Sequence, residues 1–139
     1  MEILDMECAK YGSIIADSSE NDETLIRKSL GVLQEDGVYA FFIYLCSTSE
    51  IAIKVSLETF KFLKEQGIVT VDLITKFNAY MSETNPNQRK EKLKEYINSL
   101  TNAIRNELAD DIDKLLFTKE LLERTLVYAR YHAKASGGD

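Results

Sequence analysis

His132 is the only histidine in this chain of 139 residues, and histidine is the base that most often activates a catalytic nucleophile. Its position at the edge of the apolar face of a predicted helix favours a packed or hydrogen-bonded structural role over a catalytic one. The sequence therefore predicts no catalytic residue and no enzymatic activity.

Residue types that hold metals, cofactors or nucleotides lack the spacing that such sites need. Cys8 and Cys46 show no CxxC spacing, so we expect two buried thiols, with one disulfide as the alternative. Asp110, Asp111 and Asp113 begin a predicted helix, where carboxylates stabilise the positive end of the helix dipole, and we interpret them as capping residues. No Walker, GxGxxG or GxSxG sequence occurs. We therefore expect no metal and no cofactor.

Cations grouped on one helix face offer a different chemistry, which is contact with nucleic-acid phosphates. Lys119, Arg130 and Lys134 fall within about 60° of one another on the predicted last helix, with Glu123 among them. A second group, residues 89–94, places its cations in the first turns of another helix, where the helix dipole disfavours them. A solvated charged face, an acidic neighbour or bound phosphates are the alternatives for this second group.

Tyrosine side chains stack on unpaired bases when they are exposed. Most of those in this chain are expected to anchor the core or an interface, with their hydroxyls at its rim. Tyr128 and Tyr131 are the candidates for base stacking, because they share the predicted last helix with the first group of cations.

The net charge of −6 is unevenly distributed along the chain. Residues 1–50 carry 3 basic and 10 acidic side chains, a net −7, whereas residues 51–100 carry 8 and 6, a net +2. This asymmetry favours directional contacts with partners over unaided coating of nucleic acid.

No stretch of the sequence predicts contact with a membrane. The longest apolar run, residues 38–46, is far shorter than the roughly 20 residues needed to cross a bilayer, and no leader sequence opens the chain. We therefore expect a cytoplasmic protein.

The elements that position these residues are predicted to be helices. The chain contains only one proline and six glycines, so few residues would interrupt a helix. Its apolar content of 45% is sufficient to form one hydrophobic core. Residues 51–57 also fit a strand, and the wholly apolar segment 38–45 is expected in the middle of the core or in an interface. We expect an all-α fold, a single compact bundle of six to seven helices over residues 1–135, with a flexible C-terminal tail at 136–139. Capping residues and apolar spacing predict helices over residues 3–16, 22–36, 38–45, 50–67, 70–84, 85–108 and 112–135.

Three stretches together resemble one protein family. They are residues 6–12 (MECAKYG), residues 26–43 with their QEDGV turn and FFI run, and residues 114–133, from KLLFTKE to YARYHA. The family is the small α-helical subunit of type III-B (Cmr) CRISPR effector complexes. The resemblance runs in order along most of the chain and leaves residues 50–110 without a matching motif. Cys8, Val38 and Tyr128 depart from the family pattern, which has a basic residue, a leucine and a tryptophan there.

The resemblance implies a non-catalytic subunit of an antiviral ribonucleoprotein that packs along the backbone filament and contacts phosphates without sequence specificity. The implied partners are other CRISPR effector subunits, the CRISPR RNA and target RNA, and neighbouring copies of the chain. The acidic first third is expected to face basic neighbouring subunits. Six cations are the expected phosphate contacts: Lys10, Arg27, Lys28, Lys119, Arg130 and Lys134.

A helical adaptor or homodimeric regulatory protein without a nucleic-acid role is the alternative. The negative net charge and the apolar segment 38–45 favour it.

Overall fold

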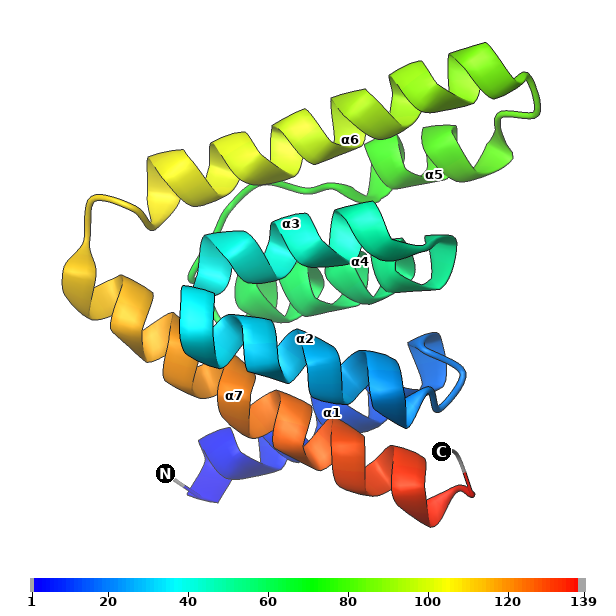
Figure 1. Cartoon of the computed structure of the whole chain (residues 1–139). Coiled ribbons are helices and arrows are strands. Elements are labelled where there is room, and N and C mark those ends of the chain that lie inside the picture. The colour runs from blue at the N-terminus through cyan, green and yellow to red at the C-terminus, as the bar shows by residue number, and fades with distance from the viewer. Residues whose placement is uncertain (1, 138–139) are drawn as a thin grey trace.

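The computed structural model describes residues 2–137, which form seven α-helices and no β-strand (Figure 1). This confirms the predicted all-α fold and the helical assignment of residues 51–57. Ser136 and Gly137 form a turn after the last helix, and the rest of the predicted tail lies outside the described residues. The helices are α1 (Glu2–Ser18), α2 (Glu23–Asp36), α3 (Val38–Thr48), α4 (Glu50–Glu65), α5 (Ile74–Ser82), α6 (Pro86–Glu107) and α7 (Ile112–Ala135).

Four helices begin at residues whose side chains cap the first turn. Asp22, Ser49, Asn85 and Asp111 each accept a hydrogen bond from a backbone N–H in the first turn of α2, α4, α6 and α7. These bonds satisfy donors that a helix start otherwise leaves without a partner. Gly37 separates α2 from α3 with a φ of +97°, a conformation that glycine adopts without strain.

Two boundaries differ from the prediction. α1 continues to Ser18, so the loop before α2 is shorter than the polar sequence suggests. The helix expected to open at Thr70 with Asp72 begins at Ile74 instead, where Asp72 Oδ1 accepts a hydrogen bond from the Ile74 N–H at 2.9 Å. The backbone N–H and the hydroxyl of Thr70 both donate to Glu107 Oε1, at 2.9 and 2.7 Å, so Thr70 anchors its segment to the end of α6.

The helices lie in three layers. α5 and α6 form one outer layer, α3 and α4 lie in the middle, and α1, α2 and α7 form the other outer layer (Figure 1). α7 packs against α1 and α2, and α6 packs against α5 and α3. None of the helices in residues 2–137 combines the length and the apolar character needed to span a bilayer.

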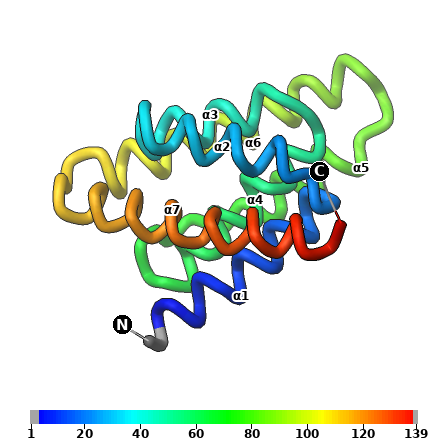
Figure 2. Tube along the Cα trace, turned by 60° about the horizontal axis from the view of Figure 1, so that its bottom comes forward, coloured from blue at the N-terminus to red at the C-terminus, as the bar shows by residue number. Residues whose placement is uncertain are grey.

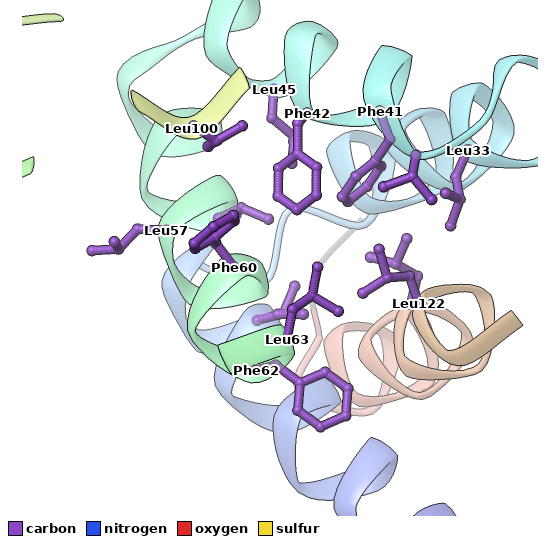
Figure 3. Close-up of a cluster of buried hydrophobic side chains, with 14 of the residues drawn as sticks. Leu33, Phe41, Phe42, Leu45, Leu57, Phe60, Phe62, Leu63, Leu100 and Leu122 are labelled. Carbon is purple, nitrogen blue, oxygen red and sulfur yellow. The ribbon is translucent and has the colours of Figure 1, made fainter. Parts of the chain in front are cut away.

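The core lies between the middle layer and its neighbours (Figure 3). Phe41, Phe42 and Leu45 of α3 are fully buried, so one side of the apolar segment 38–45 lies in the core. Tyr39 and Ile43 on the other side of α3 are exposed. The side chains that meet α3 come from α2, α4, α6 and α7 and include Leu33, Phe60, Leu63, Leu100 and Leu122.

A buried polar network joins α3, α4 and α6. The Ser56 hydroxyl donates to Ile53 O at 2.6 Å and lies 2.7 Å from the Tyr96 hydroxyl. Because a serine has one proton to donate, Tyr96 must be the donor to Ser56. The Cys46 thiol donates to the same Ser56 oxygen at 3.8 Å, and burial raises the pKa of Cys46 to about 11. Cys46 and Cys8 are both free and buried, as predicted.

Candidate nucleic-acid interface

The contact between α2 and α7 holds a buried carboxylate between two arginines. The Glu23 side chain is 8% exposed and accepts a hydrogen bond from Arg130 Nε at 2.8 Å. Arg27 Nε lies 3.8 Å from the second oxygen of the same carboxylate. A buried carboxylate needs cationic partners to offset its desolvation, so Glu23 holds Arg130 against α2.

Two lysines extend this contact along α7. Lys119 Nζ donates to Gln34 O at 3.1 Å, near the C-terminal end of α2, where backbone carbonyls lack helical partners. Lys134 lies one helical turn beyond Arg130 and is exposed. We call Arg27, Lys119, Arg130 and Lys134 the cationic seam.

The seam carries a modest positive charge. Its four cations are accompanied by Glu23 and by Glu123, which lies on the same side of α7, and together they give +2. Only the two lysines of the seam have no carboxylate within 4.0 Å among residues 4–137, so they are the cations most available to an external anion.

Lys10 and Lys28 lie away from the seam. Lys10 lies about 160° around the axis of α1 from Gly12, which packs against α7. Its Nζ lies 5.9 Å from the centroid of the Tyr11 ring. Lys28 is exposed about 100° around α2 from Arg27. The structure therefore brings together four of the six predicted contacts and leaves two on other faces.

The two candidate stacking tyrosines have different surroundings. The Tyr128 hydroxyl donates to Asp5 Oδ2 at 2.6 Å, and this hydrogen bond to a carboxylate raises the pKa of Tyr128. Tyr131 is 66% exposed, so its ring is accessible to a base or to an apolar partner. Tyr80 and Tyr96 are buried.

His132 is exposed rather than packed, and it contacts two polar residues of α1. Its Nε2 lies 3.4 Å from Ser13 Oγ and 3.9 Å from Asp17 Oδ1. A catalytic triad uses the two ring nitrogens for different partners, with the acid on Nδ1 and the nucleophile on Nε2. Here Ser13 and Asp17 both contact Nε2, so the three residues do not have the geometry of a catalytic triad. The contacts instead link α7 to α1.

The cations of residues 89–94 are partly compensated by acidic neighbours. Arg89 lies 3.5 Å from Glu50 and 4.5 Å from the centroid of the Tyr80 ring. Lys92 lies 4.0 Å from Glu95. An acidic neighbour therefore accounts for Arg89 and Lys92, whereas Lys90 and Lys94 are exposed and have no carboxylate within 4.0 Å among residues 4–137.

Comparisons with models of protein families, with curated proteins and with solved structures find no match to this chain. Within residues 2–137, no three histidine, cysteine or carboxylate side chains are placed to hold a metal ion. The functional proposal therefore rests on the geometry of the seam, together with the resemblance in residues 6–12, 26–43 and 114–133.

Glu23, which pairs with two cations of the seam, is the important residue of this site that the sequence alone did not reveal. The i, i+4 spacing of Glu23 and Arg27 is a signal for a surface ion pair on a helix. The contact with Arg130 has no such local signal, because 107 positions separate the two residues.

Proposed function

We propose that this protein is a non-catalytic small subunit of a type III-B (Cmr) CRISPR ribonucleoprotein that acts in the cytoplasm. It packs along the backbone filament and touches the phosphates of guide and target RNA without reading their sequence. The observation that carries the proposal is the cationic seam, where Glu23 holds Arg130 in place and Lys119 and Lys134 keep positive charge without a carboxylate partner among residues 4–137.

The charges of the outer layers support packing along a filament. Residues 2–36, which form α1, α2 and their loop, carry 3 basic and 9 acidic side chains, a net −6. Residues 74–107, which form α5, α6 and their loop, carry 6 and 4, a net +2. These segments lie on opposite sides of the middle layer (Figure 1). Head-to-tail contact with another copy, or with a basic backbone subunit, brings unlike charges together.

The net charge of −6 also indicates why the protein would act within an assembly. A chain with this charge is repelled by nucleic acid at long range. Neighbouring basic subunits would supply the attraction, and the seam would add a few local phosphate contacts.

Neutralising Lys119 and Lys134 tests the phosphate contacts. In the assembled complex, the double variant Lys119→Gln/Lys134→Gln should bind target RNA more weakly, and each lysine that touches a phosphate should account for a reduction of about 0.7 to 0.9 in the salt slope of binding. Lys54→Gln/Lys76→Gln is the matched control, because neither lysine lies on the seam and neither has a carboxylate within 4.0 Å in residues 4–137. Equal slopes for the two double variants and the wild type would remove Lys119 and Lys134 from the RNA site.

A helical adaptor or homodimeric regulator is the second candidate. The observation in its favour is that α7 exposes Leu116 and Tyr131, large side chains that suit a protein partner. Such a protein would make its contacts without RNA.

A further inference from the structure

α7 exposes a row of large apolar side chains on the face opposite its core-facing side. Its core-facing side includes Leu122, Leu126 and Ala129, which are fully buried. In Figure 2, α7 crosses the near side of the bundle with no other helix in front of it. We call the exposed side chains the α7 apolar row, and they are Ile112, Leu116, Phe117, Val127 and Tyr131, with exposures from 39% to 68%.

The row divides into two parts separated by charged residues. Leu116 and Phe117 lie in the first half of α7, and Val127 and Tyr131 lie in the second half. Single exposed apolar residues are ordinary, but several on one helix face indicate a contact surface.

Charged residues on this face change sign along the helix. Asp113, Glu120 and Glu123 accompany the first half. Arg124, which lies 3.8 Å from Asp5 of α1, and Lys134 accompany the second. The helix dipole favours this distribution of charge, because its positive N-terminal end attracts carboxylates and its negative C-terminal end attracts cations.

We propose that the α7 apolar row pairs with the same row of a second copy of this chain, in antiparallel orientation, around a two-fold axis between Glu123 and Arg124, so that Glu123 of each copy lies near Arg124 of the other. Parallel pairing would place acidic half against acidic half and basic half against basic half. Antiparallel pairing places each acidic half opposite a basic half, opposes the two helix dipoles, and repeats every contact twice because the interface is isologous.

In this arrangement the two apolar parts of the row meet each other. Tyr131 of one copy faces Leu116 and Phe117 of the other, and Asp113 faces Lys134. Beside Phe117, a hollow of about 230 Å³ is lined by Leu4 and Leu121, among others, and it can receive the Tyr131 ring. An aromatic ring seated in such a hollow is a common anchor of protein interfaces.

The pairing does not require the proposed RNA contacts, and it would also suit the homodimeric regulator that is the second candidate. The cationic seam lies where α7 meets α2, and the apolar row lies on the solvent-facing side of α7. Lys134 belongs to both surfaces and Glu123 lies beside both. Lys119, which lies on the seam alone, therefore separates weakened RNA binding from weakened pairing, and Leu116, which lies on the row alone, separates weakened pairing from weakened RNA binding.

Measurement of the molar mass of the isolated chain over a range of concentrations tests the pairing. The wild type should form a dimer, and Leu116→Asp should raise its dissociation constant by about tenfold or more, because pairing would bury the added charge. Val71→Asp changes a side chain of 37% exposure outside α7 and should leave the dimer unchanged. A wild type that stays monomeric, or equal effects of both variants, would overturn the proposal.

Cysteine cross-linking tests the orientation. Glu123→Cys places a thiol near the two-fold axis and should form a disulfide-linked dimer on mild oxidation. Lys134→Cys should not, because antiparallel pairing separates the two thiols by roughly 30 Å along the helix axis. The native thiols Cys8 and Cys46 are buried, so the wild type provides the background. Equally rapid cross-linking of Lys134→Cys would contradict the antiparallel arrangement.

Discussion

Replacing Gly12 with alanine is expected to lower the free energy of unfolding by about 1–3 kcal/mol, and valine by more. Gly12 lies where α1 crosses α7, and a Cβ atom there would lie 2.7 Å from Tyr128 Cβ and 2.9 Å from the backbone of Ala129 and Thr125. Because two of these contacts are with backbone, no side-chain rotation relieves them, and the helices must separate. Urea unfolding followed by circular dichroism measures the effect.

Gly31→Ala is the matched control for Gly12. Gly31 lies within α2, and a Cβ atom at this position meets nothing within 4 Å. Alanine there should stabilise the protein by about 0.5–1 kcal/mol, because it reduces the conformational freedom of the unfolded chain. If the two alanine variants changed stability equally, close approach of α1 and α7 would not be the cause.

Replacing Tyr96 with alanine is expected to lower the free energy of unfolding by about 3–5 kcal/mol. Tyr96 is completely buried, its ring packs edge-on against Phe77, and its hydroxyl donates to Ser56. It therefore connects the α5–α6 layer to the middle layer. The truncation leaves a large cavity at this junction, and denaturant unfolding of the purified variant measures the decrease in stability.

One further variant separates the stability contributed by the Tyr96 ring from that of its hydroxyl, and a second variant at an exposed tyrosine is the control. Tyr96→Phe keeps the ring and removes the hydrogen bond to Ser56, and it should cost about 1 kcal/mol. Tyr39→Ala removes a tyrosine that is 42% exposed and should change stability by about 0.5 kcal/mol or less. A small effect of Tyr96→Ala, similar to that of Tyr39→Ala, would show that the α6 layer does not depend on this side chain.

The helical architecture could be predicted from local features of the sequence. Asp22, Ser49, Asn85 and Asp111 mark helix starts because their side chains bond to backbone groups only a few positions away. The predicted start of α5 was four positions early, because Asp72 bonds to the Ile74 N–H but Thr70 does not bond to the helix. Thr70 has the chemistry of a cap, but it bonds to Glu107, which is distant in sequence.

The candidate site was predictable only in part. Helical spacing places Lys119, Arg130 and Lys134 on one side of α7, and the structure agrees. The place of Glu23 between Arg27 and Arg130 depends on how α2 packs against α7, which no local pattern encodes. The same holds for Ser13 and Asp17 beside His132.

Purification of the tagged chain from its native cells tests the proposed function most directly. A small subunit of a CRISPR ribonucleoprotein should arrive with the backbone subunits and with CRISPR RNA, identified by mass spectrometry and RNA sequencing. Recovery of the chain alone, or with protein partners and no CRISPR RNA, would contradict the proposal and favour an adaptor or homodimeric regulator.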